Sequence, residues 1–193
     1  LPVVRETQTG SAASVYPGIK SVYFEGAEYK GEPTNVYAYI GVPESGEKVP
    51  GVVLVHGGDG TAYAQWVDMW NKRGYAAIAL DMTGKSSPYE GKPVNEGYDD
   101  AWSFDTCYSE EAENQWMYQC IENIMLANNI LRNDPRVDAD KIGIVGSSWG
   151  GITTSIAMST DDRFAFAIPI YGCAYVTEST TLWSKKIMGP VKN

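Results

Sequence analysis

The chain has 193 residues, of which 44% are hydrophobic and 12% aromatic, and its formal net charge is −9. This length predicts a single domain, 1–193, the aromatic content excludes a disordered coil, and no run reaches the ~18–20 apolar residues of a membrane span. The acidic charge argues against a nucleic-acid partner, and the single histidine, His56, excludes a histidine-rich metal site and leaves one candidate for histidine-dependent catalysis.

The N-terminal part predicts an antiparallel hairpin. The chain begins with Leu1 and has no initiator Met, so we expect a processed or trimmed product. Loose alternation of apolar residues predicts a strand within Ile19–Gly31, and Val36–Val42 returns as a second strand after a polar turn. The run Gly51–Val55 is continuously apolar and β-branched, which is typical of a strand covered on both faces in a parallel sheet.

A helix and a strand are predicted next. Thr61 is the expected N-cap of a helix whose apolar residues recur at helical spacing up to Trp70, and Gly74 is the expected stop. Tyr75–Leu80 then reads as another buried strand. The segment Met82–Glu111 is long and rich in Gly, Pro, Ser and Tyr, so we expect a functional loop or lid there.

The C-terminal part completes an alternating pattern. Glu113–Asn133 is the strongest predicted helix, with one apolar face and the Asp134-Pro135 pair as its end. A short strand at Ile142–Val145, a helix at Trp149–Ser159 and a strand at Ala165–Ile170 follow. Strands that alternate with helices predict an α/β fold with a mostly parallel sheet, right-handed crossovers and helices on both faces.

Three cysteines are present, Cys107, Cys120 and Cys173. A bridge between Cys107 and Cys120 could form, but the count is odd and no CxxC pair occurs, so buried or idle thiols are the favoured interpretation.

The sequence Gly146-Ser147-Ser148-Trp149-Gly150 matches G-x-S-x-G between a predicted strand and a predicted helix. A sharp strand-to-helix turn at Gly146–Gly150, called the elbow below, would strain Ser148 and lift its hydroxyl clear of the sheet. The helix N-terminus would add a partial positive charge below that hydroxyl. Ser148 is therefore the candidate nucleophile. A plain glycine turn is the alternative.

The His56-Gly57-Gly58 sequence follows the predicted strand Gly51–Val55. An acyl-transfer enzyme needs two donors for the developing oxyanion, and the N–H groups of Trp149 and Gly58 are the candidates. We expect His56 to order this loop through hydrogen bonds rather than to act as the general base.

The chain resembles the α/β-hydrolase superfamily, and within it the dienelactone hydrolase and acetyl xylan esterase branch, which is related to prolyl oligopeptidase-type hydrolases. The segments that carry the resemblance are Val53–Gly84, Asp134–Gly151 and Asp161–Gly172, within a similarity from Ile19 to Tyr175. The resemblance implies a triad in the order Ser, acid, His, with Ser148 as nucleophile and Gly58 in the oxyanion loop. It implies no cofactor and no metal.

The chain departs from this pattern because no histidine follows Ser148. The later carboxylates are Asp161, Asp162 and Glu178, and we expect all three in turns or polar loops. The sequence thus predicts a fold that is incomplete at its C-terminal end, without the triad acid and base. Three explanations stay open: a fragment of a longer protein, a truncated gene product, or a non-enzymatic module that keeps the elbow as structure.

A sheet that ends at Ala165–Ile170 would leave an apolar edge, so we expect a further C-terminal segment or a second chain to complete it.

The favoured function is a serine hydrolase of acyl esters, an acetyl xylan esterase-like carbohydrate deacetylase. The alternatives are a catalytically silent binding or scaffold protein and a prolyl oligopeptidase-type peptidase. Aromatic residues in the expected loops either stack on sugar rings or pack the core. They are Tyr63, Trp66, Tyr89, Tyr98, Trp102, Phe104, Tyr108, Tyr171, Tyr175 and Trp183.

Overall fold

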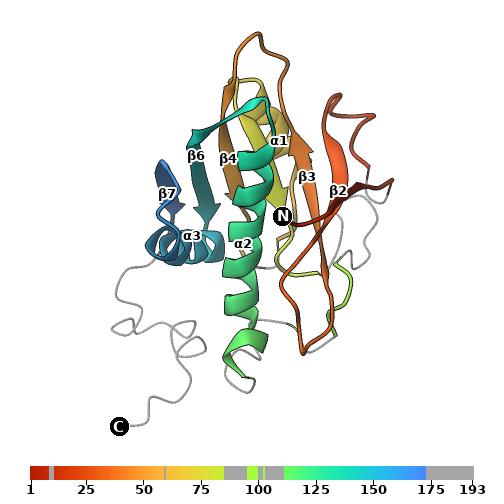
Figure 1. Cartoon of the computed structure of the whole chain (residues 1–193), viewed down its shortest axis with the longest axis vertical. Helices are drawn as coiled ribbons and strands as arrows, with labels where there is room; N and C mark the ends of the chain where they lie inside the picture. The colour runs from red at the N-terminus through yellow and green to blue at the C-terminus, as the bar shows by residue number, and fades with distance from the viewer. Residues whose placement is uncertain (9–10, 59, 85–94, 100–101, 103–110, 173–193) are drawn as a thin grey trace.

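The computed structural model describes residues 1–8, 11–58, 60–84, 95–99, 102 and 111–172, and its strands form one sheet in the order β1-β2-β3-β5-β4-β6-β7 (Figure 1). The strands are β1 (Val4–Glu6), β2 (Lys20–Glu25), β3 (Asn35–Gly41), β4 (Val49–Val55), β5 (Ala76–Leu80), β6 (Val137–Ser147) and β7 (Phe166–Ile170). The helices are α1 (Ala64–Asn71), the short 3₁₀ helix η2 (Ala112–Asn114), α2 (Trp116–Asn133) and α3 (Trp149–Thr160).

The sheet is antiparallel at one end and parallel at the other. Strands β1, β2 and β3 pair antiparallel, and β3 joins β5 in the same sense. Strands β5, β4, β6 and β7 then pair parallel, which brings the C-terminal ends of β4 and β6 side by side. The predicted antiparallel N-terminal hairpin and the α/β fold are both confirmed, and the parallel part of this mixed sheet is its half from β5 to β7.

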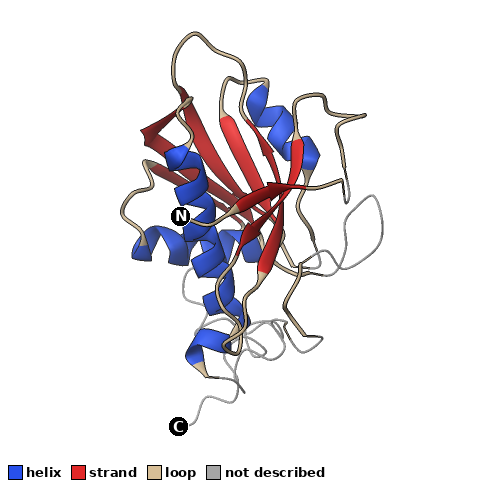
Figure 2. Cartoon of the chain, turned by 45° about the vertical axis from the view of Figure 1, so that its right-hand side comes forward, coloured by secondary structure: helices blue, strands red, loops and turns tan. Residues whose placement is uncertain are grey.

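Helices cover both faces of the sheet (Figure 2). Helix α1 packs Val67 into one core cluster with Val52 and Leu54 of β4, whereas α2 and α3 pack into the cluster on the opposite face. The apolar face predicted for α2 is its buried face. Its members are Trp116, Cys120, Ile124, Ala127 and Leu131.

Two predicted helix starts are wrong by a few residues. Helix α1 has Tyr63 as its N-cap residue rather than Thr61, and no side chain caps it. The Thr61 hydroxyl is buried and finds no hydrogen-bond partner among the described residues. Helix α2 begins at Trp116, because the residues before it form η2.

Cys120 is a buried free thiol, and burial raises its pKa well above the ordinary value. This agrees with the buried-thiol interpretation and not with a bridge to Cys107. Cys107 and Cys173 lie outside the described residues, as does most of the predicted loop between Met82 and Glu111. Within the described part of the chain, no helix combines the length and hydropathy needed to cross a bilayer.

Candidate active site

Ser148 stands alone between β6 and α3, in a conformation that serine rarely adopts. Its φ is 58° and its ψ is −117°, and a non-glycine residue in such a region costs about 1–3 kcal/mol. The Ser148 N–H donates to the carbonyl of Ile170 at the end of β7 over 2.8 Å, and the side chain is exposed. This is the strained strand-to-helix turn that the motif predicts.

Glycines make this turn possible because backbone atoms occupy the space that side chains would need. A Cβ at Gly146 would collide with the carbonyl of Gly150. A Cβ at Gly150 would collide with the Val55 carbonyl and lie 2.6 Å from that of His56. The first turn of α3 therefore sits directly against the end of β4.

The loop after β4 lies beside the serine. A Cβ at Gly57 would lie 3.2 Å from Ser148 Cβ and 3.8 Å from Ser148 Oγ. A Cβ at Gly58 would lie 2.5 Å from Cδ1 of the Trp149 indole. The structure thus brings together Ser148, Gly58 and Trp149, and the Gly58 N–H donates to no group among the described residues.

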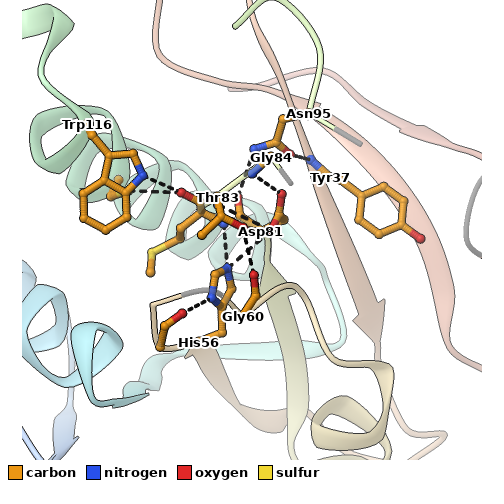
Figure 3. A network of polar contacts seen from close by, with 11 residues as sticks. Tyr37, His56, Gly60, Asp81, Thr83, Gly84, Asn95 and Trp116 are labelled. Carbon is orange, nitrogen blue, oxygen red and sulfur yellow. Dashed lines mark hydrogen bonds and ion pairs between the residues drawn. The ribbon is translucent and has the colours of Figure 1, made fainter. Parts of the chain in front are cut away.

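His56 is occupied by hydrogen bonds to backbone groups. Its Nδ1 lies 2.6 Å from the Gly57 carbonyl, and its Nε2 accepts the Met82 N–H over 2.8 Å (Figure 3). An imidazole that accepts at Nε2 and donates at Nδ1 is the neutral tautomer with no nitrogen left for a serine. His56 is also buried, with 1% of its surface exposed. It orders the loop, as the sequence analysis expects.

Asp81 is a buried carboxylate that the sequence analysis did not single out. It lies directly after β5, where its Oδ1 is 3.4 Å from His56 Nε2 and its Oδ2 accepts the Gly84 N–H over 2.7 Å. The Thr83 hydroxyl lies 2.8 Å from the Gly60 carbonyl and 3.2 Å from Asp81 Oδ1 (Figure 3). These contacts join the loop after β4 to the loop after β5. An acid at the end of a buried strand next to β4 is the signal that could have found it.

The later carboxylates do not face the serine where the structure describes them. Burial raises the pKa of Asp161, but hydrogen bonds from Arg163 outweigh it and hold the pKa below its ordinary value. Asp161 thus closes the turn after α3, as predicted, while Asp162 is exposed and Glu178 lies outside the described residues. No described side chain forms a hydrogen bond with Ser148 Oγ, so no proton acceptor for it is visible in this part of the chain.

The predicted aromatic residues that the structure describes either pack together, as Tyr63 and Trp66 do with ring centroids 4.9 Å apart, or are exposed. Tyr98 and Trp102 pack against each other in the core, with ring centroids 4.1 Å apart, and burial raises the pKa of Tyr98 to about 12. For these two, packing is the correct interpretation. Tyr171 instead is 85% exposed and follows Ile170 directly, next to the elbow. Of the others, Tyr89, Phe104, Tyr108, Tyr175 and Trp183 lie outside the described residues.

Beside the elbow, apolar side chains on one face of the edge strand β7 are partly exposed. Ile168 and Ile170 of β7 are 44% and 42% exposed. A groove of about 200 Å³ runs from this face to α1. It is lined by Leu54, Trp66, Met69, Trp70, Val145, Gly146, Ser147 and Ile170. The apolar edge predicted at the last strand is therefore present in the described part of the chain.

Comparisons with known proteins agree with this geometry. The family model of the prolyl oligopeptidase family matches residues 103–192. Dipeptidyl-peptidase 5 of Porphyromonas gingivalis is 26% identical over 141 residues, which are 68% of this chain and 18% of that protein.

Two solved structures are similar in fold. An acetyl xylan esterase from Paenibacillus sp. R4 superposes with a TM-score of 0.66 and 21% identity, over 97% of this chain and 60% of that one. A putative dienelactone hydrolase from Klebsiella pneumoniae gives a TM-score of 0.56 and 20% identity, over 95% and 65% of the two chains. This chain therefore spans only part of the length of the relatives that it matches. The sheet order and these structural matches show that the chain has an α/β-hydrolase-type fold.

Proposed function

We propose that this chain supplies the nucleophile and the oxyanion hole of a serine esterase that removes acetyl groups from carbohydrate. The observation that carries the proposal is the strained, exposed Ser148 next to the Gly58 loop. Ser148 Oγ attacks the ester carbonyl, and the N–H groups of Gly58 and Trp149 hold the negative oxygen that forms. The carbonyl collapses to an acetyl-serine as the alcohol leaves, and water then hydrolyses that ester.

The hydroxyl proton of Ser148 has to reach a base and then the leaving alcohol oxygen. His56 cannot take it, because both of its ring nitrogens are engaged. In the proposal, a histidine and an acid come from polypeptide beyond this chain, either a C-terminal segment or a second chain. The partly exposed apolar side chains of β7 beside the elbow support a partner at that position.

Acetylated carbohydrate is proposed as the substrate because the similar solved structures include an acetyl xylan esterase. Tyr171 supports this choice, since an exposed aromatic ring next to the nucleophile can stack on a sugar. A prolyl oligopeptidase-type peptidase is the second candidate. It is favoured by the family match over 103–192 and by the dipeptidyl-peptidase relative.

The test is covalent labelling of the complete protein with a fluorophosphonate, which reacts with activated serines. We expect a single adduct on Ser148, and Ser148→Ala should lose the label and lower kcat for an acetyl ester about 10⁴-fold or more. Ser159→Ala is the matched control, because Ser159 lies on the same helix and is exposed. An unlabelled wild type, with activity that Ser148→Ala leaves unchanged, would establish the silent scaffold instead.

The substrate class is tested separately with acetylated xylan and a dipeptide anilide. Faster release of acetate from the xylan than of aniline from the anilide supports the esterase. The reverse preference establishes the peptidase, with the same nucleophile.

A further inference from the structure

The two proposed oxyanion donors come from different elements, yet one side chain lies between those elements. Gly58 belongs to the loop after β4, and Trp149 opens α3. The Trp149 indole covers Gly58 so closely that a Cβ there would be 2.5 Å from Cδ1 and 3.2 Å from Nε1. The indole is therefore packed between the two elements that carry these N–H groups.

Trp149 is in turn held by Trp116, the first residue of α2. The two rings meet edge to face, with centroids 5.8 Å apart and an interplanar angle of 84°. Edge-to-face ring contacts of this kind are attractive beyond the area that they bury. Trp116 itself is 2% exposed and Trp149 8%, so neither ring has room to turn away.

Trp116 also reaches the Gly57-Gly58 loop by a second, polar route. Its indole Nε1 donates to the Met82 carbonyl over 2.7 Å (Figure 3). Met82 donates its own N–H to His56 Nε2 over 2.8 Å, and His56 Nδ1 lies 2.6 Å from the Gly57 carbonyl. The backbone of Met82 is thus held from both sides.

Both routes start at Trp116 and end at the Gly57-Gly58 loop. One runs through the Trp149 indole to Gly58, and the other runs through Met82 and His56 to Gly57. Oxyanion donors act only within about 2.7–3.1 Å of the charge, and a misplacement of about 1 Å can cost ~10²-fold in rate. A side chain that takes part in both sets of contacts therefore holds the Gly58 and Trp149 N–H groups in position.

We propose that Trp116 is the positioning residue of the oxyanion hole: its ring holds the Trp149 indole while its N–H holds the backbone that carries His56 and the Gly57-Gly58 loop. This inference rests on the proposed function, because it assigns catalytic roles to the Gly58 and Trp149 N–H groups. Trp116 touches no reacting atom. It acts through the residues that do.

Trp102 offers a matched control. Like Trp116 it is a buried tryptophan in the same aromatic cluster, with ring centroids 6.5 Å apart. Its Nε1, however, finds no hydrogen-bond partner among the described residues. Replacement by Phe removes an indole N–H in both cases, but only Trp116→Phe removes one that holds the Met82 carbonyl.

The kinetic test uses the complete protein and an acetyl ester such as 4-nitrophenyl acetate. We expect Trp116→Phe to lower kcat about 10- to 100-fold while KM changes less than threefold, because the lost interaction matters in the transition state. Fluorophosphonate labelling should slow by a similar factor. Trp102→Phe should stay within twofold of wild type in both. A Trp116→Phe enzyme with unchanged kcat that melts at a lower temperature would overturn the proposal and leave only a packing role.

Hydrogen exchange keeps the inference testable if the proposed function fails. The Met82 amide, which donates to His56 Nε2, should exchange at least tenfold faster in Trp116→Phe and unchanged in Trp102→Phe. A missing label on wild-type Ser148 would refute the esterase but not this result. Equal Met82 exchange in the wild type and Trp116→Phe would refute the positioning role whatever the activity.

Discussion

The turns that follow β4 and β6 lie side by side but are built in opposite ways. The turn after β6 is fixed by close contact: Gly146 and Gly150 stand where any side chain would meet backbone, and Ser148 takes a left-handed conformation. The turn after β4 is fixed by hydrogen bonds that reach it from buried side chains, among them His56 and Thr83.

Under the proposed function, this difference separates two tasks of the site. A nucleophile has to keep its hydroxyl free for the base that activates it, so its turn cannot depend on other side chains that would hydrogen-bond to that hydroxyl. An oxyanion loop needs unoccupied N–H groups, so other groups have to hold its carbonyls and its histidine in place. The turn after β6, the contact-built turn, should therefore respond mainly to added volume. The turn after β4, the bonded turn, should respond also to the loss of single polar atoms.

The largest effect is expected at the contact-built turn. In Gly150→Ala the new Cβ would lie 2.6 Å from the His56 carbonyl and closer still to that of Val55. Neither carbonyl can move without disrupting β4. We expect the free energy of unfolding to fall by about 3 kcal/mol, the upper end of the usual cost of overpacking. Urea titration of the purified protein measures it.

Gly46→Ala is the control for this substitution, because a Cβ at Gly46 would meet nothing within 4 Å. Its free energy of unfolding should change by less than about 0.5 kcal/mol. Equal stability of Gly150→Ala and Gly46→Ala would show that contact does not fix the elbow.

A smaller effect is expected at the bonded turn, from one hydroxyl. Thr83→Val removes the oxygen that lies 2.8 Å from the Gly60 carbonyl, and we expect unfolding to become easier by about 1.5 kcal/mol. Thr61→Val removes a buried hydroxyl with no partner among the described residues, so it should be neutral or stabilising. Thermal unfolding of the two variants side by side gives the difference, and equal losses would contradict it.

The sequence predicted the parts of this architecture that are locally encoded. A local sequence pattern predicted the β-branched strand β4 and the apolar stripe of α2, and the structure confirms both. Strand β1 was not predicted, because its three residues are all exposed and pair only with β2. Residues 137–141 of β6 also escaped, because they alternate with polar side chains although they extend the strand.

The site divides in the same way. Ser148 and Gly58 could be proposed from the sequence because their turns follow strands in a recognisable pattern. The contacts of Asp81, Met82 and Trp116 depend on how the end of β5 meets the start of α2, 34 positions apart in the case of the Met82–Trp116 bond. No local pattern encodes such a meeting, so tertiary packing had to reveal it.

The smallest effect is expected at the turn after α3, which is also bonded and can be tuned by pH. Arg163 lies 2.7 Å from Asp161, whose carboxyl is 3% exposed, and the pKa of Asp161 lies below its ordinary value. A depressed pKa in the folded state contributes stability above the unfolded pKa and loses it as pH falls through the folded pKa. Asp161→Asn should therefore cost about 1 kcal/mol near neutral pH, a value reduced because Arg163 is partly exposed to solvent.

That difference should shrink as the solution is acidified below pH ~4, because the wild-type carboxyl then becomes protonated as well. Asp162→Asn is the matched control, since Asp162 is the next residue and is exposed; it leaves the Asp161–Arg163 contacts in place, so it should cost less stability at neutral pH than Asp161→Asn. Urea titrations between pH 3 and pH 7 give both curves. A gap between Asp161→Asn and wild type that stays constant over this range would mean that packing, not the charge of Asp161, holds the turn. The elbow has no titrating hydrogen-bond partner among the described residues, so the loss of unfolding free energy in Gly150→Ala should stay constant over the same pH range. A constant loss at the elbow and a pH-dependent loss at Asp161 would distinguish a turn held by close contact from a turn held by a charge.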